Sequence, residues 1–222
     1  MAIAFDAANS GSSAGAQPSL TIATTVTGSN TYGVVMASHD GSQTMNITGV
    51  TWNGVAMTNV NNLANVSSNS NTSLWVVANP TTGNVVISVS PNRQLYGITL
   101  SYTGANQTGQ PDANNTTSDS TSPYTISTTT VSDNDWIICI ARGGTTLNAG
   151  TNVTARSAPF STIKAGDTNG PITPAGATTQ TWTDSGASAE TALLTVALKP
   201  VSATPATGAP VPHRLSLLGV GT

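Results

Sequence analysis

Apolar and polar residues alternate with a period of two along most of the chain. Tyr96, Ile98, Leu100 and Tyr102 form one such row, and the segment 194–198 forms another. Successive side chains of a β-strand point to opposite faces, so this period predicts strands with one buried face. Since no segment shows a sustained apolar stripe at helical spacing, the pattern predicts an all-β chain.

Two segments, 74–78 and 136–141, are apolar at nearly every position. Such runs are typical of central strands that are covered on both faces, and we expect both segments to be strands of this kind. Three polar segments, 59–72, 104–123 and 141–152, are rich in Asn, Ser, Thr and Gly. We interpret these as loops, because such residues favour turns.

The residues around Asn53 and Gly54 predict a tight hairpin. Asn-Gly suits a two-residue type I′ turn, in which both central positions need a positive φ. This register pairs Trp52 with Val55 and would place both side chains on one buried apolar face. With about ten to twelve expected strands, we predict an antiparallel β-sandwich of the jelly-roll type.

The chain divides into a domain and a tail. We expect residues 1–199 to form the sandwich, residues 200–212 a linker rich in Pro, Ala and Thr, and residues 213–222 a short apolar peptide. The linker composition favours extended conformations. The tail is interpreted either as disordered or as an extended arm that docks on a neighbouring subunit as an added strand. The arm hypothesis depends on four aliphatic residues that a free tail would leave exposed: Leu215, Leu217, Leu218 and Val220.

Composition narrows the classes of partner that this chain can have. Only 7% of the 222 residues are charged, and the net charge is −3. The 38 Thr and 25 Ser residues must supply much of the polar surface. Six cations without clustering argue against a nucleic-acid partner. No apolar run is long enough to span a bilayer, and the N-terminus lacks the features of a secretory signal. The single cysteine, Cys139, lies in an apolar segment and is interpreted as an inert core thiol.

Candidate chemistry is sparse. No spacing of His, Cys, Asp and Glu predicts a metal site, and we expect neither a cofactor nor enzymatic activity. His39 is interpreted as a strand-end residue rather than a general base. Asp133 and Asp135 precede an apolar strand; a structural turn is favoured over a calcium site or a catalytic role. Trp182 has polar neighbours, so it is the best candidate for an exposed contact with a glycan or a protein.

Several segments together resemble a β-sandwich domain found in structural proteins of tailed phages and in bacterial surface proteins. They are Ala2–Asp6, Gly49–Thr58, Ser73–Pro80 and Leu100–Ala105. The resemblance covers residues 1 to 199. It implies a fold more than a role, and it carries over no catalytic residues.

Three functional hypotheses follow. The favoured one is a non-enzymatic virion protein of a bacteriophage, either a capsid decoration protein or a tail-associated protein. Its partners would be other virion proteins and itself, and it would be assembled in the host cytoplasm. The second is a carbohydrate-binding or adhesive module with an exposed aromatic platform at Trp182. The third is a glycan hydrolase, which requires two aspartates across an open groove.

Overall fold

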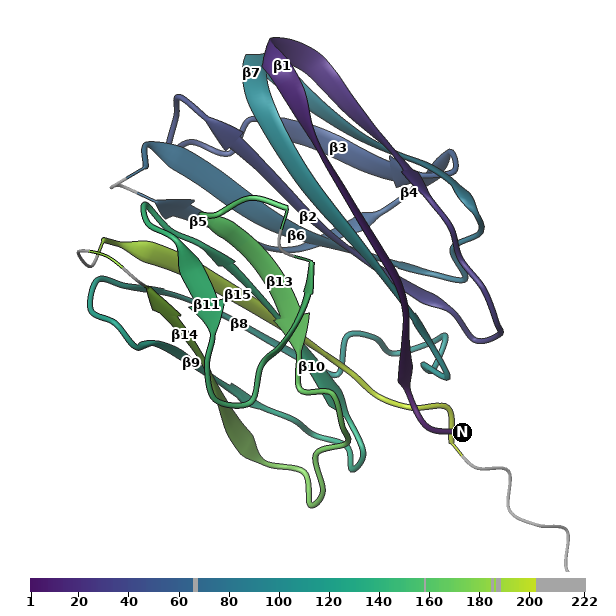
Figure 1. The fold of residues 1–222 in the computed structure, drawn as a ribbon. Helices are drawn as coiled ribbons and strands as arrows, with labels where there is room; N and C mark the ends of the chain where they lie inside the picture. The colour runs from purple at the N-terminus through teal and green to yellow at the C-terminus, as the bar shows by residue number, and fades with distance from the viewer. Residues whose placement is uncertain (66–67, 158, 185, 187–188, 203–222) are drawn as a thin grey trace, which may run out of the picture.

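The computed structural model describes residues 1–65, 68–157, 159–184, 186 and 189–202. Its regular structure consists of strands that form three antiparallel sheets (Figure 1). The strands are β1 (Ala4–Thr24), β2 (Tyr32–Asp40), β3 (Ile47–Trp52), β4 (Val55–Ala56), β5 (Thr58–Asn65), β6 (Ser70–Ala78), β7 (Gly83–Thr103), β8 (Ala113–Asp119), β9 (Tyr124–Thr129), β10 (Trp136–Arg142), β11 (Leu147–Ala149), β12 (Thr154–Ser157), β13 (Ile163–Asp167), β14 (Ala177–Asp184) and β15 (Thr191–Leu198).

The first sheet has the strand order β4-β3-β7-β2-β6-β5, and β1 also pairs with β7. The long strands β1 and β7 pair from Ala4–Thr103 to Thr24–Gly83, with three register shifts. β7 pairs with β3 through its first half and with β2 through its second half. The sheet therefore curls, and one apolar cluster, which includes Trp52 and Val77, lies between its two halves.

The second sheet has the order β12-β13-β10-β15-β8 and packs against the first. Their shared main core contains Val34 and Met36 from β2, Ile138 and Ile140 from β10, and Leu194 from β15. Alternate residues of these strands point into this core, as the period of two in the sequence requires.

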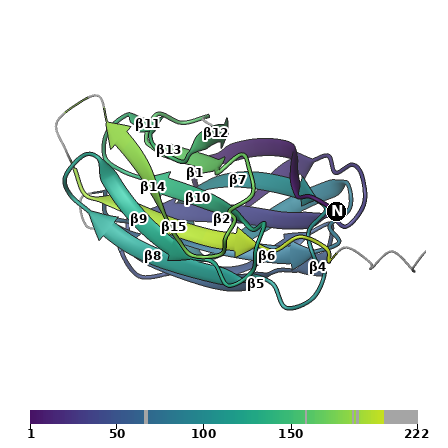
Figure 2. The ribbon, with the colours of Figure 1, turned by 90° about the horizontal axis from the view of Figure 1, so that it is seen from below.

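The third sheet has the order β11-β14-β9 and covers the other face of β10 and β15. Trp182, Ile126, Cys139 and Leu193 meet in the small cluster between these sheets. Figure 2 shows the layers from below. The segment 136–141 is therefore buried on both faces, as expected for a central strand, and the prediction of an all-β antiparallel sandwich is confirmed.

The Asn53-Gly54 hairpin is also confirmed. Asn53 and Gly54 have φ values of 46° and 83°, and Trp52 pairs with Val55. The expectation that Val55 would be buried is wrong: Trp52 is 1% exposed and Val55 is 58% exposed. β4 is a two-residue edge strand, and the apolar cluster that contains Trp52 continues at Met57, which is 7% exposed.

The expectation that the three polar segments are loops is wrong in part. The strands β5 and β8, and the short strand β11, lie within them. Each is at the edge of its sheet, where a strand makes ladder hydrogen bonds on one side and needs few apolar residues. Backbone pairing also continues beyond residue 199, since Ala105 bridges to Pro200 and the Val201 amide donates to the Gly104 carbonyl at 2.9 Å.

Candidate functional site

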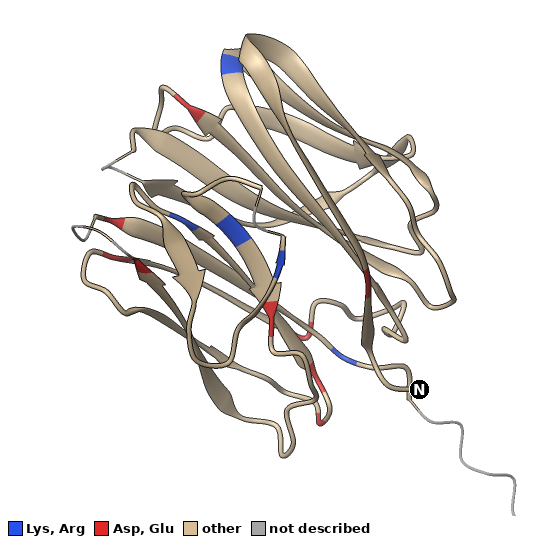
Figure 3. Ribbon diagram, viewed as in Figure 1, with Lys and Arg blue, Asp and Glu red and all other residues tan. Residues whose placement is uncertain are grey.

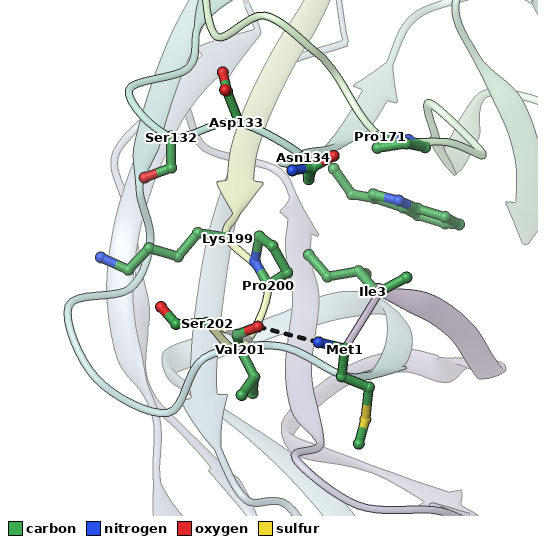
Figure 4. Close-up of a pocket in the computed structure, with 12 residues that line it drawn as sticks. Met1, Ile3, Ser132, Asp133, Asn134, Pro171, Lys199, Pro200, Val201 and Ser202 are labelled. Atoms are coloured by element: carbon green, nitrogen blue, oxygen red, sulfur yellow. Dashed lines mark hydrogen bonds between the residues drawn. The ribbon is translucent and has the colours of Figure 1, made fainter. Parts of the chain in front are cut away.

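A pocket of about 620 Å³ opens where the two ends of the described chain meet (Figure 4). The first residues of the chain, the turn before β10 and the residues after β15 line it. Its apolar wall includes Ile3, Trp136, Pro171 and Pro200. Ile3 and Trp136 also belong to the main core, and both are less than a tenth exposed. The pocket therefore opens at one edge of the core between the first two sheets.

The chain leaves this pocket from a fixed position. The Lys199 carbonyl accepts hydrogen bonds from the Asn106 amide at 2.9 Å and from Gln110 Nε2 at 2.8 Å. The Met1 ammonium group donates to the Val201 carbonyl at 3.3 Å. These contacts, with the Val201–Gly104 hydrogen bond, hold residues 199–201 on the domain.

Gly104 makes this arrangement possible. Its φ is +72°, and a Cβ at this position would lie 2.1 Å from the carbonyl oxygen of Ala2. Only glycine combines this conformation with so close an approach of another backbone. The N-terminal residues can therefore pack directly against the segment that holds the exit of the chain.

The turn before β10 supplies the polar rim of the pocket. Asp133 is exposed, and its Oδ1 accepts a hydrogen bond from the Ala175 amide at 2.7 Å. Asn134 has a φ of 68° and accepts a hydrogen bond from Thr173 Oγ1 at 3.0 Å. These contacts support the turn interpretation of this segment, and the carboxylate of Asp133 points outward from the rim in Figure 4.

Asp135 lies behind this rim and is completely buried. Neither of its carboxyl oxygens meets a well-placed hydrogen-bond donor among the described residues. Burial, followed by a hydrogen bond with Asp112 and the charge of that neighbour, raises the pKa of Asp135 to about 8. Asp135 is therefore protonated at neutral pH, and its own proton makes the hydrogen bond to Asp112.

Asp112 has the opposite environment. Its carboxylate accepts hydrogen bonds from the Val131 amide at 2.7 Å and from the Ser132 amide at 3.0 Å. Burial alone would raise its pKa, but the hydrogen bonds from Asp135, Val131 and Ser132 outweigh burial and lower the pKa of Asp112. The sequence does not indicate this pair, because its members lie on different segments. A hydrolase needs two carboxyl groups that face an open groove, and the burial of Asp135 does not provide that geometry.

A second ionic cluster lies at the other end of the main core. Arg142, at the end of β10, is 4% exposed and forms a salt bridge with Asp40. Its guanidinium also donates to Ser38 and lies 5.2 Å from the ring centroid of Tyr96. Because Ser38, Asp40 and Tyr96 belong to the first sheet, this arginine links the two sheets.

A third cluster contains Arg156 and Asp167. Arg156 Nε and Nη2 donate to the two carboxylate oxygens of Asp167 at 2.8 and 3.0 Å. The Tyr102 hydroxyl donates to the same carboxylate at 3.0 Å, and the Arg156 guanidinium lies 4.6 Å from the ring centroid of Phe5. The carboxylate of Asp167 is engaged by Arg156 and Tyr102 within the fold, so the arrangement of this cluster is structural. Charged residues are few and scattered over the rest of the described ribbon (Figure 3).

The proposed exposure of Trp182 is wrong. Trp182 is completely buried, and its Nε1 donates to Cys139 Sγ at 3.2 Å. Its polar neighbours Thr181 and Thr183 point away from this cluster, because side chains alternate along β14. All four tryptophans of the chain are less than a tenth exposed, so none provides a platform for a sugar ring.

The other residues considered in the sequence have structural environments. Cys139 is buried, and burial raises its pKa to about 12, consistent with an inert thiol. His39 is completely buried, and burial lowers its pKa. Its Nε2 accepts a hydrogen bond from the Asn46 amide at 3.2 Å, so the ring stabilises the end of β2 and the loop after it.

Some expectations lie outside the described residues. Leu215, Leu217, Leu218 and Val220 belong to the segment 203–222, which the structure does not describe. Within the described ranges, no group of three His, Cys, Asp or Glu residues could hold a metal ion. The same part of the chain contains no helix with the length and apolar character needed to cross a membrane.

Comparison with protein-family models, with curated proteins and with solved structures gave no match for this chain.

Proposed function

We propose that this protein is a non-enzymatic structural subunit of a bacteriophage particle, in the capsid decoration or in the tail, and that it acts by assembling with other proteins. Its partners in this proposal are further virion proteins and other copies of itself. The resemblance of residues 1–199 to a β-sandwich domain of tailed-phage structural proteins and bacterial surface proteins implies a fold more than a role, and it is compatible with the assignment to a virion.

The observation that carries the assembly role is the fixed exit of the chain at residues 199–201. Hydrogen bonds from Asn106, Gln110 and Val201 hold this exit beside the pocket. Twenty further residues follow Ser202, and they include Leu215, Leu217, Leu218 and Val220. An arm that starts from a fixed point can reach a neighbour in a defined direction, and burial of its aliphatic side chains would favour association.

The test compares the full chain with a truncation after Ser202. Light scattering would give the mass of each protein over a range of concentrations, and thermal unfolding would report the stability of each. We expect the full chain to form oligomers and the truncated protein to remain a monomer with the same Tm. If both proteins stay monomeric at all concentrations, self-assembly through the arm is wrong. A lower Tm after truncation would instead place the tail within its own domain.

A further inference from the structure

We propose that the pocket between Ile3, Asp133, Trp136 and Pro200 binds the apolar peptide 213–222 of a second copy of this chain. This inference rests on the proposed assembly function and names the partner and its binding site.

The first argument is chemical fit. The pocket has an apolar wall that includes Ile3, Trp136 and Pro171, and its volume of about 620 Å³ lies within the usual range for ligand pockets. The peptide 213–222 offers four aliphatic side chains in eight residues, from Leu215 to Thr222. An apolar pocket with a polar mouth is suited to a short segment with this composition.

The second argument is charge complementarity. Asp133 is the exposed carboxylate among the residues that line the pocket, and one of its oxygens is not used in the hydrogen bond to Ala175. The peptide begins with His213 and Arg214, immediately before its aliphatic residues. The Asp133 carboxylate points outward from the rim (Figure 4), so an arginine at this position can pair with it outside the cavity while the following leucines enter the pocket.

The two positive groups near the pocket do not prevent this pairing. The Met1 ammonium group is already bonded to the Val201 carbonyl. The Lys199 side chain leads away from the cavity in Figure 4. Its Nζ lies over Gly109, 2.9 Å from the place where a Cβ would be.

The third argument is reach, which favours a second copy over the chain's own tail. Residues 203–212 contain Pro205, Pro210 and Pro212, and such a linker favours a stiff, extended path. At a rise of roughly 3.1 Å per residue, ten residues in this conformation would span about 31 Å. In this proposal the linker would carry the peptide away from the pocket that Pro200 and Ser202 line and toward that of a neighbour.

Contact between the tail of one copy and the pocket of the next is head-to-tail. Such contacts can close as a reciprocal exchange between two copies or as a larger ring, or they can continue as an open chain. The proposal therefore predicts association that depends on concentration and that continues beyond the dimer unless a reciprocal exchange or a ring closes.

The experiment uses full-length variants and the synthetic peptide 213–222. Sedimentation or light scattering would measure self-association, and Trp136 fluorescence would follow binding of the added peptide. We expect Leu217→Ala to weaken association about tenfold or more, because a large apolar side chain would no longer be buried. Asp133→Asn keeps an acceptor for Ala175 but removes the charge, and we expect up to about a fivefold loss.

A charge exchange gives the decisive control. Asp133→Lys and Arg214→Glu should each weaken association, by about tenfold, and the doubly substituted chain should recover most of the loss. Free peptide should dissociate the oligomers, whereas a peptide with Leu217 and Leu218 replaced by serine should not.

Several results would overturn the inference. If the full chain associates but the Asp133 variants and added peptide have no effect, the arm binds another surface, and the proposed assembly function stands without this site. If the full chain is monomeric at every concentration and the tail-less protein binds the peptide, the pocket holds the chain's own tail. If neither association nor peptide binding occurs, both the site and self-assembly are wrong.

Discussion

Asp167 and Asp135 are both completely buried beside the second sheet, but they meet different partners. Asp167, at the end of β13, receives two hydrogen bonds from the Arg156 guanidinium and one from the Tyr102 hydroxyl. Asp135, immediately before β10, meets another carboxyl group, that of Asp112. The buried carboxylate of Asp167 is therefore stabilised by a cation, and the buried carboxyl group of Asp135 is stabilised by its own proton.

This difference determines how each site should respond to change. A buried carboxylate that depends on a cation loses its stabilisation when the cation is removed, at any pH at which the carboxylate is charged. A buried carboxyl that depends on a proton loses its stabilisation when the pH rises above its pKa. The two sites can therefore be distinguished by substitutions and by pH.

The largest effect is expected for Arg156→Met. Methionine retains much of the apolar contact of the side chain but leaves Asp167 without its cation, and breaking a buried pair in this way costs about 3–5 kcal/mol. Urea unfolding would measure the loss. Adding Asp167→Asn should recover part of it, because the unpaired charge is then removed. A loss below about 1 kcal/mol in Arg156→Met would show that water reaches Asp167 and that its burial is incomplete.

The next largest effect is the pH dependence caused by Asp135. Its pKa is about 8 in the folded protein and near 3.8 without the fold. The folded form therefore keeps a proton that the unfolded chain has lost, and the resulting stabilisation is complete below pH 4 and lost as the pH rises through 8. Asp112 is ionised in both states above pH 6, so it does not mask this loss.

Asp135→Asn should remove this dependence, because an amide can donate to Asp112 without titrating. We expect the variant to be about 1–3 kcal/mol more stable than the parent at pH 9 and within about 1 kcal/mol of it at pH 6. The comparison is made between the two proteins at each pH, since His39, whose pKa is lowered by burial, favours the folded state as the pH rises above 6. Equal slopes of stability against pH in both proteins would contradict a protonated Asp135.

The sequence predicts the strands of this fold when an apolar face is present and misses them when it is not. The central strands at 74–78 and 136–141 are confirmed because a strand between two cores must be apolar on both faces. The edge strands β5 and β8 consist largely of Asn, Thr and Ser. The backbone hydrogen bonds that hold these strands in their sheets do not depend on apolar side chains, so the hydropathy pattern does not indicate them. The third sheet was not predicted, because nothing local shows that a second face of β10 and β15 is covered.

The same limit applies to the site. The turn at Asp133 could be interpreted from local sequence, whereas Asp112 and Asp135 are brought together by pairing of β8 with β15 and of β10 with β15. Trp182 was misassigned because its neighbours in sequence, Thr181 and Thr183, occupy the opposite face of β14. The period of two separates Trp182 from these threonines, but only the third layer explains its complete burial.

A smaller effect is expected for Tyr102→Phe. The substitution removes one of the donors to Asp167, while Arg156 still provides two, so the expected loss is about 1 kcal/mol. The matched control is Tyr32→Phe in the same main core, where the structure shows no hydrogen bond from the hydroxyl to a described residue, and we expect a change below about 0.5 kcal/mol. Both are measured by urea unfolding at pH 7. Similar losses in the two variants would mean that the hydrogen bond from the Tyr102 hydroxyl does not stabilise the carboxylate of Asp167.

The smallest effect on stability is expected for a substitution of Asp133, an exposed aspartate near the buried Asp135. It lies two residues from Asp135, but its side chain is exposed, and its carboxylate points outward from the rim of the pocket (Figure 4). Asparagine retains the acceptor for the Ala175 amide, so Asp133→Asn should change the free energy of unfolding by less than about 0.5 kcal/mol. Thermal unfolding at pH 7 would test this. A loss comparable to that of Arg156→Met would show that the domain itself uses the charge of Asp133, and this carboxylate would then not be free to bind the arginine of a neighbouring chain.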